Sequence, residues 1–231
     1  MALSNTAVVS ETDETGGMKA VKFAETRPLP SYLVAFAVGP FEAVDAGKIG
    51  KKQTPLRIIA THRRSGEAKY AAEVTGPILA SLEDYFGIPY PYEKLDSIAV
   101  PLFFGAMENP GLITYGQTLI LSKPEQDGVE RQRNYADTAA HEMAHMWFGD
   151  LVTTAWWDDI WLNEEVRGRL RQGLESCRFV KYSKRRTCRL LCGRAEGGAE
   201  CVFHGFPIKY FCYRLFWEMQ PLARKGRLRA L

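Results

Sequence analysis

Apolar residues in the first quarter of the chain follow the pattern of β-strands. Val21 and Phe23 alternate with polar neighbours, which is the period of a strand with one buried face. Two short apolar runs, residues 32–38 and 56–60, indicate further strands, and Gly39-Pro40 closes the first of them. We therefore predict strands within residues 19–62.

A helical period replaces this pattern after Ser65. The apolar stripe at helical spacing consists of Tyr70, Val74, Ile78, Leu82 and either Tyr85 or Phe86. We expect a helix over residues 66–86, with Ser65 as its N-cap, Gly87 at its end and the stripe in the core. Pro77 inside this segment should kink or split the helix, because proline donates no backbone hydrogen bond.

The next elements are predicted as two extended segments and a second helix. Residues 95–104 and 112–121 are rich in β-branched and aromatic side chains. Residues 129–148 then have an apolar helical face, and Gly149 is expected to end that helix. This order of strands and helices predicts a mixed α/β (α+β) fold.

The second helix carries the chemistry of the chain in His141-Glu142-Met143-Ala144-His145. Histidines four residues apart project from one helix face and can share a tetrahedral zinc ion. Glu142 lies between them and can accept a proton from a water molecule on the metal. Glu164 offers a third ligand and leaves the fourth position open, as in catalytic zinc sites.

Two motifs together make residues 105–164 resemble the membrane alanyl aminopeptidase family of gluzincin metallopeptidases. The first is Gly105-Ala106-Met107-Glu108-Asn109, and the second is H-E-x-x-H followed eighteen residues later by Glu164. The resemblance extends back to about residue 19 and implies a thermolysin-like zinc peptidase core. Residues 1–64 would then be the last strands of an amino-terminal β-domain, and residues 65–164 a partial catalytic domain.

The resemblance also implies roles for these residues. One zinc ion would be held by His141, His145 and Glu164, and Glu142 would act as general base. The segment from Gly105 to Asn109, with Ala106, Met107 and Glu108, would bind a peptide substrate. Its backbone would pair with the extended peptide, and Glu108 would anchor the free amino terminus. The implied partners are peptides with a free amino terminus.

The surroundings of the third ligand allow fewer assignments. Asp150, Asp158 and Asp159 are all candidates for hydrogen bonds that orient the histidines. The tryptophans nearby, Trp156, Trp157 and Trp161, are expected to pack rather than to contact substrate. The family also supplies a tyrosine downstream to stabilise the oxyanion. The tail tyrosines, Tyr182, Tyr210 and Tyr213, stand in no matching sequence, so we assign this role to none of them.

Composition changes abruptly after Glu164. Residues 1–164 contain 14 basic and 22 acidic residues, a net charge of −8, whereas residues 165–231 contain 16 basic and 5 acidic residues, a net charge of +11. All five cysteines lie in this tail as well. We interpret residues 165–231 as non-native sequence, produced by a frame shift or an assembly fault, and expect poor order after about Arg178.

Two other interpretations of the tail remain. Cys188, Cys192, Cys201 and His204 could hold a second zinc ion, although their spacing matches structural zinc sites poorly. The basic excess could attract nucleic acid non-specifically, but no recognisable module indicates a specific nucleic-acid partner.

Targeting signals are not evident in this chain. Residues 1–17 are polar and acidic, so we predict no signal peptide, and no apolar run reaches the length of a membrane span. The compartment therefore stays open. The sequence predicts a zinc-dependent aminopeptidase, impaired in this chain by its divergent tail. The alternative is a zinc-binding fragment without catalytic activity.

Overall fold

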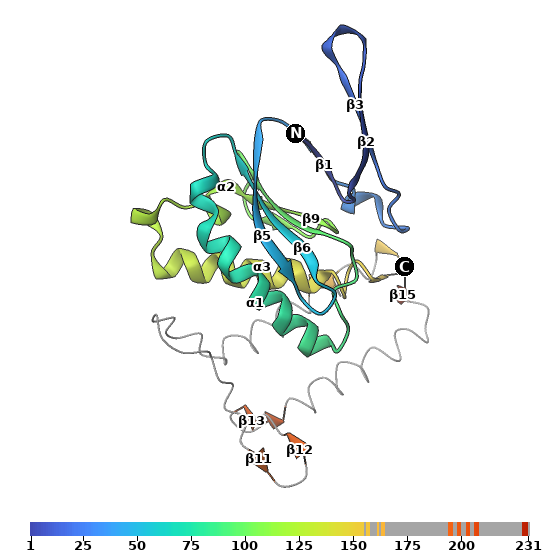
Figure 1. Ribbon diagram of the computed structural model, residues 1–231. Coiled ribbons are helices and arrows are strands. Elements are labelled where there is room, and N and C mark those ends of the chain that lie inside the picture. Colours follow the sequence, from blue (N-terminus) through green and yellow to red (C-terminus); the bar gives the residue numbers. More distant parts are fainter. Residues whose placement is uncertain are drawn as a thin grey trace. The chain divides into compact units, whose positions relative to one another are not determined.

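The computed structural model describes residues 1–154, residues 156, 157, 161, 163 and 164, and short strands within residues 194–230 (Figure 1). The chain divides into a first unit that contains Met1–Val152 and a second unit, Thr153–Ala230. Among the described residues the fold mixes helices and strands, as predicted. The part of the sequence that the structure describes contains no helix long and apolar enough to cross a membrane.

A five-stranded sheet forms the centre of the first unit. Its order is β5 (Phe41–Ile49), β6 (Thr54–Thr61), β7 (Leu95–Val100), β9 (Leu112–Gly116) and β8 (Ala106–Met107). The three inner strands β6, β7 and β9 run parallel, while β5 and β8 pair antiparallel at the two edges. The motif around Glu108 therefore begins on an edge strand.

Two helices complete the core. α1 (Lys69–Phe86) connects β6 to the parallel strand β7 and packs on β5, β6 and α3 (Val129–His145). On the sheet, Leu3 of β1 (Ala2–Ser4) forms a buried cluster with Ile59, Ile98 and Leu112. The inner strands are consequently buried along most of their length, which agrees with their mainly apolar sequences.

The amino-terminal strands form two small sheets. β1 pairs with β4 (Phe36–Val38), and β2 (Val8–Asp13) forms a hairpin with β3 (Lys19–Phe23). Figure 1 shows this hairpin as a narrow projection from the rest of the unit, and every residue of β2 is exposed. A short 3-10 helix, Thr15–Gly17, forms its tip, and another, Ser31–Leu33, precedes β4.

The remaining elements are short. In the first unit these are the 3-10 helix Pro124–Gln126 and α2 (Gln117–Ile120). The others are β10 (Val152–Thr154), β11 (Arg194–Ala195), β12 (Gly198–Ala199), β13 (Val202–Phe203), β14 (Phe206–Pro207) and β15 (Leu228–Ala230). They pair as β10 with β15, β11 with β12 and β13 with β14. The tail cysteines and the predicted loss of order after Arg178 lie outside the described residues.

The first helix ends where it is predicted to end, but it begins three residues later than predicted, at Lys69 instead of residue 66. Ser65 opens a 3-10 turn, Ser65–Ala68, and makes no capping hydrogen bond to the α-helix, which begins at Lys69. Pro77 does not split α1. The helix tolerates the lost backbone bond because it is supported by packing on the sheet and on α3. Gly87 ends it in the left-handed conformation, as predicted.

Three predicted strand segments are shorter than expected. Residues 32–38 begin as 3-10 helix, and β7 stops at Val100 rather than residue 104. β9 stops at Gly116, after which residues 117–120 form α2, whose contacts with α3 and β7 override local β-propensity. α3 itself ends at His145, three residues before the predicted end.

Candidate active site

The two histidines of α3 converge as their spacing predicts. Nε2 of His141 and Nε2 of His145 lie 3.2 Å apart. Nδ1 of His145 lies 3.3 Å from the carbonyl oxygen of Phe148. In the tautomer where Nδ1–H donates to that carbonyl, the lone pair of Nε2 is available to a metal ion.

This separation fits the zinc ion that the motif implies. Two zinc–nitrogen bonds of about 2.0–2.1 Å at a tetrahedral angle place the nitrogens about 3.3 Å apart. If neither Nε2 atom is protonated, two lone pairs face each other and repel, and a cation between them removes this repulsion. If one is protonated, it can donate a hydrogen bond to the other. The distance between His141 and His145 is therefore that of two ligands of one ion, and their role as ligands stays a prediction.

Two carboxylates from separate motifs lie beside the histidines. Glu142 follows His141 on α3 and is 4% exposed, and Glu108 follows β8 and is 6% exposed. One carboxylate oxygen of each lies within 4.8 Å of the other and of a ring nitrogen of His145. Both motifs of the sequence thus meet at one buried place.

Backbone geometry shapes the segment that carries Glu108. Gly105 has a φ of +84°, and its carbonyl oxygen accepts a hydrogen bond of 2.8 Å from the N–H of Gly116. A side chain at Gly116 would lie 2.5 Å from the carbonyl oxygen of Phe103, so this close approach requires glycine. β8 then pairs with Thr114 and Tyr115 and leaves its outer side at the edge of the sheet.

Aromatic contacts hold α3 in place. The hydroxyl groups of Thr75 and Tyr135 are 2.8 Å apart between α1 and α3. Trp147 stacks on Phe86 with ring centroids 5.0 Å apart, and its Nε1–H donates to the carbonyl oxygen of Ile88. The helix that carries the histidines is thereby fixed to the end of α1.

Asp150, one of three candidates left open for orienting the histidines, makes no side-chain hydrogen bond to His145. The backbone N–H of Asp150 donates to the carbonyl oxygen of His145, while the ring nitrogen Nδ1 of His145 faces Phe148 instead. Among the described residues, neither carboxylate oxygen of Asp150 has a hydrogen-bond partner. Burial, and then the nearby carboxylates of Glu108 and Glu142, raise the pKa of Asp150 well above its ordinary value.

Glu164 and the residues predicted around it are described only in part. Glu164 is helical and exposed and belongs to the second unit, so its role as a ligand stays a prediction. Trp156, Trp157 and Trp161 are all more than half exposed, which contradicts the predicted packing role. Asp158 and Asp159 lie outside the described residues.

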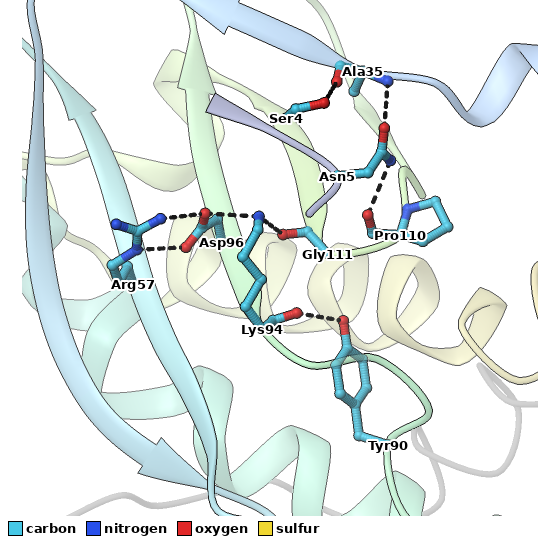
Figure 2. Close-up of polar contacts among 9 residues, drawn as sticks. All are labelled: Ser4, Asn5, Ala35, Arg57, Tyr90, Lys94, Asp96, Pro110 and Gly111. Atoms are coloured by element: carbon cyan, nitrogen blue, oxygen red, sulfur yellow. Dashed lines mark hydrogen bonds and ion pairs between the residues drawn. The ribbon is translucent and has the colours of Figure 1, made fainter. Parts of the chain in front are cut away.

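Figure 2 shows polar residues that the sequence interpretation missed. Asp96 of β7 is fully buried between Arg57 and Lys94, and Asn5 contacts Pro110 from the amino-terminal segment. A charged pair at the start of a buried strand, such as Lys94 and Asp96, is the signal that could have indicated this cluster. No local signal indicates Asn5, because its partner is 105 residues away.

The sequence is similar to a known peptidase domain and to several aminopeptidases. Residues 70–169 match the peptidase family M1 domain. Glutamyl aminopeptidase of Bos taurus is 42% identical over 164 residues, which is 71% of this chain and 17% of that relative. Aminopeptidase M1-A of Oryza sativa subsp. japonica is 43% identical over 165 residues, with 71% and 18% covered.

A human relative has similar identity and coverage. Endoplasmic reticulum aminopeptidase 1 of Homo sapiens is 40% identical over 165 residues, again 71% of this chain and 17% of the relative. The chain thus spans less than a fifth of the length of these curated relatives. The matched domain contains Glu108 and the histidines of α3, and through this domain the chain belongs to the peptidase family M1.

Proposed function

We propose that this chain is, or forms part of, a zinc-dependent aminopeptidase that releases amino-terminal residues from peptides. The observation that carries the proposal is the meeting of Glu108, Glu142 and His145 within 4.8 Å. The similar relatives are named as aminopeptidases, which supports the same reaction. We further propose that the segment from Ser65 to Glu164 is a thermolysin-like core.

His141, His145 and Glu164 are the residues that would hold zinc. The 3.2 Å separation of the histidine nitrogens supports the first two, and the eighteen-residue spacing in the sequence supports the third. When bound, zinc supplies Lewis acidity, which makes water more acidic and polarises a peptide carbonyl group.

Glu142 serves as the general base. Its carboxylate is buried beside the histidines, with one oxygen 3.8 Å from Nε2 of His141. It takes a proton from the attacking water and delivers a proton to the nitrogen of the leaving amine, which breaks the peptide bond. Because Glu142 is a base and not a ligand, its amide variant should keep the metal.

Glu108 and the edge of β8 position the substrate. The outer side of β8 can pair with an extended peptide, as in strand addition, and Glu108 then receives the positively charged amino terminus. A carboxylate buried at this point favours a free amine over a blocked one. This arrangement accounts for removal of one residue from the amino terminus.

The test is hydrolysis of an aminoacyl 4-nitroanilide by the purified, zinc-loaded chain and by Glu142→Gln. We expect the variant to retain one zinc per chain, measured by atomic emission, and to lose about 100-fold to 10,000-fold in kcat. An N-acetylated substrate should not be cleaved. Zinc binding without turnover in the unaltered chain would instead establish the alternative, a zinc-binding chain without catalytic activity.

A further inference from the structure

Asn5 joins the amino-terminal segment to the loop that follows Glu108. The side-chain nitrogen Nδ2 of Asn5 donates to the carbonyl oxygen of Pro110 at 2.9 Å, as Figure 2 shows. It also donates to the carbonyl oxygen of Leu33 at 3.0 Å. Its oxygen Oδ1 accepts the backbone N–H of Ala35 at 2.9 Å. The side chain is 6% exposed, so these contacts are made away from solvent.

The backbone of Asn5 fits against the same loop. Gly111 has a φ of +72°, and a Cβ atom there would lie 2.2 Å from the carbonyl oxygen of Asn5. No side chain is possible at this distance, so Gly111 allows the two backbones to touch. Asn5 therefore contacts two consecutive residues of the loop, Pro110 through its side chain and Gly111 through its backbone.

The opposite side of the loop is held by charge. Lys94 Nζ donates to the carbonyl oxygen of Gly111 at 2.5 Å and to Asp96 Oδ2 at 2.9 Å. Asp96 is bound in turn by Arg57, through Nε at 2.7 Å and Nη2 at 2.6 Å, as Figure 2 shows. Asp96 belongs to β7, and Lys94 comes directly before that strand, so the pair fixes Gly111 against a rigid element.

The loop held in this way is the direct continuation of Glu108. Asn109 donates through Nδ2 to the carbonyl oxygen of Leu33 at 3.2 Å, which is the acceptor that Asn5 also uses. The backbone N–H of Leu112 donates to the carbonyl oxygen of Asn109 at 3.0 Å and closes a tight turn. A displacement of Pro110 would thus change the backbone direction at Glu108.

We propose that Asn5 is a positioning residue, which places the carboxylate of Glu108 to receive the amino terminus of the substrate. This inference rests on the proposed function of Glu108. Asn5 makes no contact with substrate in this role and acts through Pro110 and Gly111. The contact reaches across 105 residues of sequence, so it couples the amino-terminal strands to the substrate anchor.

The kinetic test compares Asn5→Ala with Ser4→Ala. Ser4 is a matched control because its hydroxyl also bonds Ala35, at 2.9 Å, but does not reach Pro110. With an aminoacyl 4-nitroanilide, we expect Asn5→Ala to raise KM about 10-fold and to change kcat about 2-fold at most, because binding of the amine is weakened. Ser4→Ala should leave both constants unchanged. Equal effects of the two substitutions would overturn the proposal.

Aspartate at the same position makes the test more specific. Asn5→Asp keeps the shape of the side chain but removes both N–H donors and places a carboxylate against the carbonyl oxygens of Leu33 and Pro110. It should therefore raise KM more than Asn5→Ala does. If circular dichroism shows that Asn5→Ala is unfolded, Asn5→Ser replaces it, since serine is too short to reach Pro110.

Hydrogen exchange tests the positioning without any need for turnover. In Asn5→Ala, backbone amides of residues 106–112 should exchange about 10-fold faster, whereas those of α3 should not change. Unchanged exchange at residues 106–112 would overturn the inference even if the chain is active. Absence of turnover in the unaltered chain would refute the proposed function alone, and the exchange result would still decide whether Asn5 holds the loop.

Discussion

The two halves of the candidate site are held by different kinds of contact. α3, which carries His141 and His145, is fixed mainly by apolar and aromatic packing, with Trp147 stacked on Phe86. The loop after Glu108 is fixed by buried polar groups, chiefly Asn5 and the cluster of Lys94, Asp96 and Arg57. A helix makes most of its backbone bonds within itself, whereas an irregular loop must find partners for its carbonyl groups elsewhere.

The difference has an energetic consequence. Packing contacts are lost gradually as a core is trimmed, but a buried ion that loses its partner is left with a large desolvation penalty. The loop half should therefore be more sensitive to single substitutions than the helix half. Substitutions in each half test this contrast.

The largest effect on stability is expected for Asp96→Ala. This change leaves the ammonium group of Lys94 buried without its carboxylate partner and removes the bidentate contact of Arg57. We expect a loss of about 3–5 kcal/mol in the free energy of unfolding. Urea denaturation followed by tryptophan fluorescence measures it.

Asp84→Ala is the control for Asp96→Ala. Asp84 pairs with Lys51 at 2.9 Å, the distance between Lys94 and Asp96, but its side chain is 78% exposed. An exposed pair contributes about 0–1 kcal/mol, so this variant should unfold almost as the unaltered chain does. Similar losses for the two variants would contradict the idea that burial makes the loop half sensitive.

Asp150→Asn is expected to have a smaller effect, and of opposite sign. Because the pKa of Asp150 is raised in the folded state, folding takes up a proton as long as the pH lies between its ordinary and its raised pKa. The contribution of Asp150 to stability is then greatest below its ordinary pKa and falls as the pH rises toward the raised one. The amide carries no charge and avoids this loss.

The gain from Asp150→Asn should therefore grow with pH. In zinc-free protein we expect about 1–3 kcal/mol of added stability at pH 8 and a smaller gain near pH 5, measured by urea denaturation at both values. Asp84→Asn, at an exposed position, should give no such trend. A gain that is independent of pH would show that Asp150 is not buried as an unpaired acid.

The smallest effect is expected for Tyr135→Phe in the helix half. The substitution removes one hydroxyl contact with Thr75, but Thr75 still donates to the carbonyl oxygen of Ala71 and the aromatic ring remains packed. We expect a loss of about 0.5–1.5 kcal/mol from the same denaturation measurement. A loss above about 3 kcal/mol would mean that α3 depends on polar contacts as strongly as the loop does.

Sequence periodicity predicted the helix half well. The four-residue spacing of His141 and His145 places both on one helix face whatever the surrounding fold is, so a local rule was sufficient. The same rule of helical spacing gave the position and the end of α1. It did not give its start, because the 3-10 turn at Ser65–Ala68 ends the loop before the α-helix begins.

The loop half could be predicted only in part. The motif around Glu108 identified the segment, but its supports come from Asn5, 105 residues distant from Pro110, and from charged residues on a buried strand. Local pattern contains no information on such long-range pairs. The predicted packing of the tryptophans near Glu164 was wrong for another reason. Aromatic character favours burial only where neighbouring elements cover the side chain.

The cluster around Asp96 also bears on how the sheet assembles. Asp96 lies directly opposite Arg57 in the parallel pairing of β6 with β7, and the first five residues of β7 are all buried. In such a strand the apolar pattern discriminates poorly between alignments, because both faces are apolar. A shift of one residue would turn Asp96 to the other face, away from Arg57 on β6. The pairing of Asp96 with Arg57 thus favours the native register over the shifted one.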